Sequence, residues 1–121
     1  MRKRMGGAGL VAGLLAATLH GCVHATYIPT GEAYPSRSGN CDVQVFSSAP
    51  PERPYVELGI VEGEGDWWKA DLEDILPRLK EEACLAGGDA IIMGANNRYA
   101  EGEDGIRVQH VTATVIRWRR R

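Results

Sequence analysis

The 121-residue sequence lacks the marks of several large protein classes. It contains no GxSxG, HExxH or CxxC motif and only three histidines, so serine hydrolases, zinc peptidases and thiol redox enzymes are not indicated. It also has no run of about 20 apolar residues, the length that a membrane-spanning helix needs. We therefore predict that the protein is not an enzyme, and no motif implies a cofactor or a metal.

Positive charge is also in short supply. The formal net charge is −2, from 14 basic and 16 acidic residues, and three of the basic ones are Arg2, Lys3 and Arg4. Setting these three aside leaves 11 basic residues against 16 acidic ones, so nucleic acid is not an expected partner. One dense basic run remains, at the C-terminal end. It is interpreted either as a solvated terminus or as a contact for anionic lipid or lipopolysaccharide, and its last residues are Arg119, Arg120 and Arg121.

The N-terminal residues predict export. A basic start is followed by 15 apolar or small residues, from Met5 to Leu19, which is the pattern of a signal peptide. The next four residues, Leu19-His20-Gly21-Cys22, resemble the lipobox of bacterial lipoproteins. This resemblance implies a signal peptide over residues 1–21 and a lipid on the thiol of Cys22. Val23 after the cysteine, in place of Asp, favours the outer membrane by similarity to enterobacterial sorting.

Two alternatives to lipidation stay open. Val23-His24-Ala25 offers a small-residue cut after Ala25, which would remove Cys22 and give a secreted or periplasmic soluble protein. An uncleaved start would leave the chain in the cytoplasm. Either cut places the domain outside the cytoplasm.

Cysteine is scarce, and its count is informative. A lipid on Cys22 leaves Cys41 and Cys84 as an even pair in an oxidising compartment, so we predict a disulfide between them. A bridge closing a loop of about 44 residues would stabilise the fold by roughly 4 kcal/mol on the chain-entropy model. The alternative is two unpaired buried thiols.

Residues 22–40 are predicted to be a lipidated cysteine followed by a flexible tether, because the stretch is rich in Pro, Gly and Ser and shows no apolar periodicity. The domain is placed at residues 41–121. Its predicted strands cover residues 43–46, 55–62, 89–96 and 106–118, with a hairpin loop at 101–105. Between the second and third strands, apolar residues recur at helical spacing over residues 71–86.

The predicted helix contains Pro77, which favours a start near Asp74, and Gly87-Gly88 supply its stop. The order β-β-α-β-β predicts an α+β fold with a single helix packed on a small, mostly antiparallel four-stranded sheet. A right-handed crossover predicts that the second and third strands run parallel. The direction of the first strand relative to the second is left open.

Several short blocks resemble a known group of proteins: Val43-Gln44-Val45-Phe46, then Glu57-Leu58-Gly59-Ile60-Val61, and Gly88-Asp89-Ala90-Ile91-Ile92 after the helix. They are similar to RcsF-type envelope lipoproteins and, more distantly, to YbjQ-like domains. The resemblance implies a small tethered module with a disulfide. RcsF-type proteins carry four core cysteines and signal envelope damage, whereas this core has two, and no functional residue is carried over.

The remaining candidate residues have both a structural and a functional interpretation. Of Trp67 and Trp68, one is taken to pack under the helix start as part of the core and the other to be exposed; the alternative is a stacking surface for a glycan or partner. His110 is taken as a packed or solvated strand residue. Two acidic groups are interpreted either as solvated loops or as ligands for Ca²⁺ or Mg²⁺, and they are Glu62, Glu64, Asp66 and Glu101, Glu103, Asp104.

Two hypotheses for function follow. The first is a membrane-anchored envelope lipoprotein that binds, or senses through, a partner protein or envelope polymer without catalysis. The second is a domain that binds a small ligand or a divalent cation and assembles into oligomers, as YbjQ-like domains do.

Overall fold

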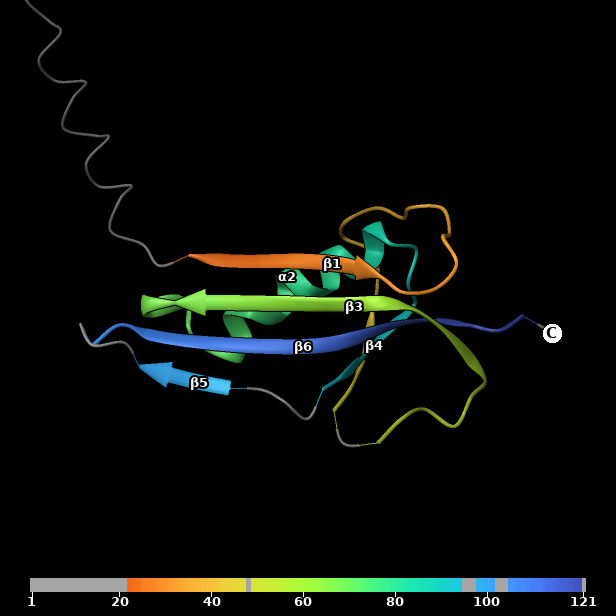
Figure 1. Cartoon of the computed structure of the whole chain (residues 1–121). Coiled ribbons are helices and arrows are strands. Elements are labelled where there is room, and N and C mark those ends of the chain that lie inside the picture. Colours follow the sequence, from red (N-terminus) through yellow and green to blue (C-terminus); the bar gives the residue numbers. More distant parts are fainter. Residues whose placement is uncertain (1–21, 48, 95–97, 102–104, 121) are drawn as a thin grey trace, which may run out of the picture.

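The computed structural model describes residues 22–47, 49–94, 98–101 and 105–120. They form six strands, a short 3-10 turn and an α-helix (Figure 1). The predicted signal peptide, residues 1–21, lies outside the described residues. The elements in chain order are β1 Val23–Pro29, β2 Gln44–Phe46, β3 Tyr55–Asp66, η3 Trp67–Lys69, α2 Leu72–Leu85, β4 Ala90–Met93, β5 Arg98–Glu101 and β6 Arg107–Trp118.

All six strands belong to one sheet, in the order β1-β3-β6-β4-β2, with β5 also paired to β6. Every pairing is antiparallel except that of β2 with β4. The predicted α+β fold, one α-helix on a mostly antiparallel sheet with a disulfide, is confirmed, although the sheet has two strands more than predicted. β3 and β4 run in the same direction, with β6 between them. β2 shares that direction and lies at the edge opposite β1.

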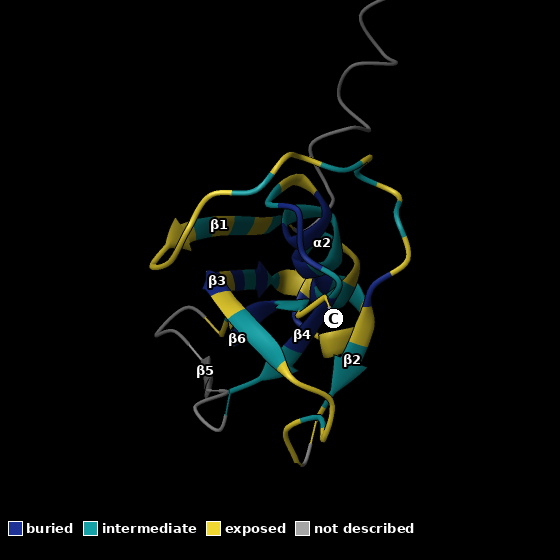
Figure 2. Cartoon of the chain, turned by 90° about the vertical axis from the view of Figure 1, so that its right-hand side faces the viewer, coloured by how far each residue is buried: buried dark blue, intermediate teal, exposed yellow. Residues whose placement is uncertain are grey.

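The helix packs on one face of the sheet through a fully buried stripe formed by Ile75, Leu79 and Ala83. Seen end-on, the sheet curves around α2, and the buried residues gather between the two layers (Figure 2). The helix begins at Leu72, so the predicted start near Asp74 is wrong. The carbonyl of Asp71 already accepts hydrogen bonds from the backbone of Asp74 and Ile75, at 2.9 and 3.3 Å, and closes the first turn before Pro77.

The helix ends where the glycines predict. Gly87 adopts a left-handed φ of 85°, its N–H donates to the carbonyl of Cys84 at 3.0 Å, and Gly88 donates to Ala83 at 2.8 Å. These are the two hydrogen bonds of a Schellman motif, which glycine at the left-handed position makes without steric cost.

β3 is four residues longer than predicted because α2 packs closely against the glycines near its end. A Cβ at Gly63 would lie 2.6 Å from the Ile75 side chain and 2.7 Å from that of Leu79. At Gly65 it would meet the carbonyl of Lys69 at 2.0 Å. The alternating glycines therefore form a flat floor for α2, rather than the loop that their sequence suggests.

The predicted tether is wrong over its first half, because residues 23–29 form edge strand β1, antiparallel to β3. Val23, Ala25 and Tyr27 alternate towards the core and pack against it. Burial raises the pKa of the Tyr27 phenol. The following residues also contact the domain, since Arg37 N–H donates to the carbonyl of Cys84 at 2.9 Å. The domain therefore begins directly after Cys22.

The predicted disulfide between Cys41 and Cys84 is confirmed, with a Cα–Cα distance of 5.8 Å. Cys84 is fully buried in the last turn of α2, so the bridge fastens the segment before β2 to the helix. No helix within the described residues is both long and apolar enough to cross a bilayer.

Candidate functional site

The two ends of the sheet hold the candidate functional residues. At one end, Cys22 continues the ladder between β1 and β3: its N–H donates to the Asp66 carboxylate at 2.8 Å, and its carbonyl accepts from the Asp66 N–H at 3.0 Å. Cys22 itself is exposed, and it is the one cysteine outside the disulfide. A lipid on its thiol would therefore be joined to the sheet with no spacer.

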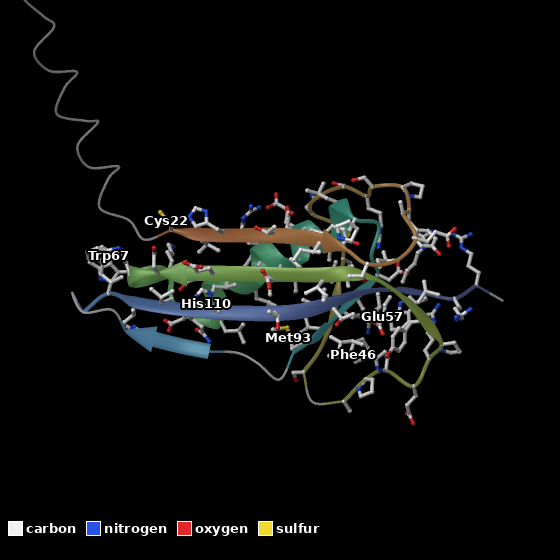
Figure 3. The ribbon with its side chains drawn as sticks, viewed as in Figure 1. Cys22, Phe46, Glu57, Trp67, Met93 and His110 are labelled. Carbon is white, nitrogen blue, oxygen red and sulfur yellow. A yellow bond between two sulfur atoms is a disulfide. The ribbon has the colours of Figure 1, made fainter. Side chains whose placement is uncertain are left out.

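Trp67 and Trp68 follow Asp66 directly and lie at the same end as Cys22 (Figure 3). The interpretation that one of them packs in the core under the helix start is wrong, because neither is buried: the two residues are 49% and 69% exposed. Their ring centroids are 5.8 Å apart. Trp67 has a positive φ of 56°, which turns the chain sharply after β3 and is an unfavourable conformation for a bulky side chain.

The charged groups around this end are largely paired. Arg107 contacts Asp71 at 3.1 Å, and Lys69 contacts Asp74 at 4.0 Å. The face of the sheet opposite α2 is here called the open face. On it, two residues along β3 from Asp66, Glu64 lies 3.4 Å from His110 Nδ1. The Cys22 end therefore combines exposed aromatic surface with two described ion pairs.

An arginine groove lies at the opposite end of the sheet, where β6 finishes. It has a volume of about 820 Å³ and is lined by Arg53, Pro54, Asp89, Arg117, Trp118, Arg119 and Arg120. A smaller hollow of about 310 Å³ at the same end of β6 shares four of these lining residues and adds Tyr34 and Val56. Because β3 spans 12 residues between the two ends, the arginine groove is roughly 35 Å from Cys22.

Aromatic rings and backbone contacts fix the arginines of the groove. The guanidinium of Arg53 lies 4.7 Å from the centroid of the Trp118 ring, and that of Arg117 lies 4.6 Å from the Tyr34 ring. Phe46 meets the Trp118 ring edge-on at 6.0 Å. The predicted Arg119 and Arg120 are exposed there, and Arg121 lies outside the described residues.

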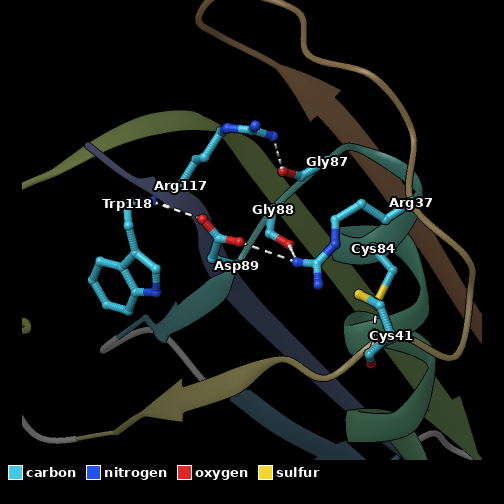
Figure 4. A network of polar contacts seen from close by, with 8 residues as sticks. All are labelled: Arg37, Cys41, Cys84, Gly87, Gly88, Asp89, Arg117 and Trp118. Atoms are coloured by element: carbon cyan, nitrogen blue, oxygen red, sulfur yellow. Dashed lines mark hydrogen bonds and ion pairs between the residues drawn. A yellow bond between two sulfur atoms is a disulfide. The ribbon is translucent and has the colours of Figure 1, made fainter. Parts of the chain in front are cut away.

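Asp89 is the one carboxylate among the described residues that line the groove, and both of its oxygens accept hydrogen bonds (Figure 4). One of its oxygens accepts from Arg37 at 3.1 Å, and the other accepts from the Trp118 backbone N–H at 2.9 Å. Arg37 also donates to the Gly88 carbonyl at 2.8 Å, and Arg117 donates to Gly87 at 3.0 Å. This network joins the helix C-terminus to β4 and β6 and leaves the groove with a net positive lining.

The acidic residues do not form the predicted loop cluster. Glu62, Glu64 and Asp66 lie in β3 itself, on the open face, and successive ones are about 7 Å apart along the strand. Glu101 ends β5 at the same end of the sheet, whereas Glu103 and Asp104 lie outside the described residues. In the part of the chain that the structure describes, no group of three or more His, Cys, Asp or Glu side chains is placed to hold a metal ion.

Sequence reasoning found the tryptophans and the terminal arginines but missed their neighbours. Arg53 lies in the proline-rich connection between β2 and β3, which carries no functional signal in the sequence. The contact between Cys22 and Asp66 spans 44 positions and depends on β1, which was not predicted. The alternation of Val23, Ala25 and Tyr27 was the available signal for β1.

Comparisons with known proteins support the fold alone. No protein-family model matches the sequence, and no curated protein does either. Among solved structures, the chain is similar to a crystal structure of the Francisella virulence factor FvfA, with 17% identity and a TM-score of 0.50. The similarity covers 75% of this chain and 96% of the FvfA chain. At this identity it transfers no residue role.

Proposed function

We propose that the protein is a non-enzymatic lipoprotein of the bacterial cell envelope, anchored by a lipid on Cys22, that binds an anionic partner through the arginine groove. The observation that carries the proposal is the pairing of Cys22 with Asp66: the Cys22 N–H donates to the Asp66 carboxylate, and the Cys22 carbonyl accepts from the Asp66 N–H. Removal of residues 1–21 leaves this pairing intact, because a new α-nitrogen at Cys22, as an amine or an amide, still carries an N–H. The lipobox cut thus coincides with the start of the β1–β3 ladder.

The secretory cut after Ala25 fits the fold less well. It would remove the pairs that Val23, His24 and Ala25 form with Gly65, Glu64 and Gly63. It would also remove Val23 and Ala25, whose side chains pack against the core. A protein processed in this way would lose almost half of an edge strand, which favours Cys22 as the first mature residue.

The arginine groove supports binding rather than catalysis. Guanidinium groups bind carboxylates and phosphates through paired hydrogen bonds, and the Trp118 ring offers an apolar floor beside them. The one carboxylate in the lining, Asp89, is held by Arg37 and by the backbone of Trp118. An acidic envelope polymer or an acidic protein surface matches this lining.

Location and sensing rest on sequence similarity. Val23 after Cys22 favours the outer membrane, and the resemblance to RcsF-type lipoproteins adds envelope sensing as a role for the same module. Both remain predictions.

Metabolic labelling tests the anchor. Cells expressing the full chain are grown with an alkyne analogue of palmitate, and the labelled protein is compared with the Cys22→Ala variant. We expect labelling of the original chain and none of the variant. Equal labelling of both would contradict the lipid assignment.

Crosslinking in intact cells tests the groove. A photoreactive residue at position 119 should capture a specific partner, whereas the same residue at position 112, on the open sheet face, should not. The combination Arg53→Gln, Arg119→Gln and Arg120→Gln should abolish the capture by a second photoreactive residue at position 54. Arg78→Gln, on the surface of α2, serves as the matched control. Capture that survives the triple substitution would contradict the proposed site.

A further inference from the structure

We infer that Trp67 and Trp68, here called the tryptophan seat, insert into the headgroup layer of the bilayer that holds Cys22 and fix the orientation of the domain on it. This inference rests on the proposed function, because it takes Cys22 as the anchored residue. It assigns the lipid headgroups as the partner of an exposed aromatic surface, which the lipid anchor alone does not explain.

Position is the first argument. Cys22 is hydrogen-bonded through its N–H and its carbonyl to Asp66, and the tryptophan seat begins at the next residue. No spacer separates Cys22 from β1, so a lipid on its thiol would hold this end of the sheet against the bilayer. Figure 3 shows Cys22 and Trp67 together at this end.

Exposure and backbone geometry are the second argument. Trp67 is about half exposed and Trp68 is 69% exposed, although Trp is among the most costly side chains to leave in water. Trp67 also holds a positive φ of 56°, a conformation that is unfavourable for a bulky residue. Tryptophan is the residue most enriched at membrane interfaces, where its apolar ring and polar N–H are both satisfied.

Charge is the third argument. Among the described side chains near the seat, Arg107 pairs with Asp71 and Lys69 with Asp74, and the Asp66 carboxylate accepts the N–H of Cys22. Glu64 lies two residues before Asp66, about 7 Å along β3 from the Cys22 end. This distance is about the depth of a headgroup layer, so Glu64 would lie at the outer edge of that layer. It contacts His110 at 3.4 Å. Because both basic side chains beside the seat are paired with aspartates, the contact is expected to rest on the aromatic rings rather than on anionic lipid.

The orientation that follows is specific. With the tryptophan seat in the headgroups, β1 and β3 rise from the bilayer, and the arginine groove stands roughly 35 Å above it in the aqueous phase. Contact of the terminal arginines with the anchoring membrane, one of the interpretations of the sequence, is not compatible with this orientation. The groove is then free to meet a soluble or polymeric partner.

Depth-dependent fluorescence quenching tests the seat, because the chain has three tryptophans and the third, Trp118, lies in the groove. The lipidated protein is reconstituted into phosphatidylcholine vesicles that contain brominated phosphatidylcholine. The Trp118→Phe variant reports on the seat, and the combination Trp67→Phe and Trp68→Phe reports on Trp118. We expect the seat to lose more than about half of its emission and to shift to the blue, since its rings lie among the lipids, whereas Trp118 emission stays unchanged.

The same sample separates the two proposals. Intact mass shows whether Cys22 carries lipid; if it does and the seat is not quenched, the inference is overturned while the anchor stands. If Cys22 carries no lipid, the anchor proposal fails, and Cys22 is coupled to a maleimide phospholipid before the measurement is repeated. Quenching of the seat in that sample supports the inference, and its absence overturns it. Quenching of Trp118 to the same degree as the seat also overturns it, because the domain would then lie flat.

Discussion

At the scale of single residues, Trp67 combines an exposed side chain with a left-handed backbone conformation. Replacing it with glycine should therefore raise the stability of the fold but weaken its contact with the membrane. In Trp67→Gly the φ of 56° is no longer strained, so the free energy of unfolding should rise by about 1 kcal/mol. Quenching by brominated lipid should fall in the same variant. Urea unfolding of the mature chain, residues 22–121 with Cys22→Ser, gives the stability.

Trp68→Gly is the matched control, because Trp68 is not among the residues with positive φ. It should gain no stability and should also lose quenching. A Trp67→Gly chain that is less stable than the Trp68→Gly chain would contradict the claim that the backbone of Trp67 is strained.

A second prediction concerns Gly63, on which the helix rests. In Gly63→Ala the added methyl group would lie 2.6 Å from Ile75 and 2.7 Å from Leu79, so α2 must shift outward. We expect a loss of about 1–3 kcal/mol in the free energy of unfolding, as for other overpacked cores. Gly39→Ala is the control, since its Cβ would meet only the flexible side chain of Glu81, at 3.4 Å. Equal stability of the two variants would mean that the helix does not pack closely on β3.

At the scale of elements, β1 distinguishes the two possible processing sites. A chain starting at Thr26 loses three paired residues and the packed side chains of Val23 and Ala25. Compared with a chain starting at Cys22→Ser, we expect it to be less stable by roughly 2–3 kcal/mol, from lost apolar burial and lost hydrogen bonds. Thermal unfolding of the two chains side by side measures the difference. Indistinguishable midpoints would remove the structural argument against the secretory cut.

Elements with a strong local pattern were predictable. The helical spacing from Leu72 to Ala83 and the Gly87-Gly88 stop specified α2, because amphipathic periodicity and C-capping are local properties. The strand pattern of residues 106–118 specified β6 in the same way. Trp67 and Trp68 stood out by residue type, but their exposure did not follow from the sequence.

Two other elements could not be predicted because partners distant in the sequence decide them. β1 has one apolar face of small and aromatic residues and becomes a strand only by pairing with β3. The last part of β3 looked like a loop because Gly63 and Gly65 are poor strand residues, and contact with α2 reverses that preference. For the same reason, Glu62 and Glu64 lie on the open face of β3 rather than in the predicted acidic loop.

At the scale of the whole molecule, the disulfide joins the segment before β2 to α2 and so restricts the unfolded chain. The loop that it closes spans 43 positions, so the combination Cys41→Ala and Cys84→Ala should lower the free energy of unfolding by about 4 kcal/mol on the chain-entropy model. Urea unfolding under oxidising conditions measures the loss. A loss below about 1 kcal/mol would show that the reduced unfolded chain is already restricted.

The two ends of the molecule differ in character, and each end carries one of the proposed contacts. One end carries Cys22, the proposed site of the lipid anchor, together with the tryptophan seat, and the far end carries the arginine groove. β3 runs from one end to the other and no tether separates Cys22 from β1, so on the proposed anchor the length of β3 sets the height of the groove above the bilayer. This arrangement suits a module that presents a basic surface at a fixed distance from a membrane.

The most direct test of the anchored start at Cys22 is mass spectrometry of the mature N-terminus, with protein purified from the membrane fraction of cells that express the full chain. The account predicts an N-terminal peptide that begins at Cys22 and carries the mass of a diacylglycerol group on its thiol. A mature protein that begins at Thr26, or one that retains residues 1–21, would contradict it.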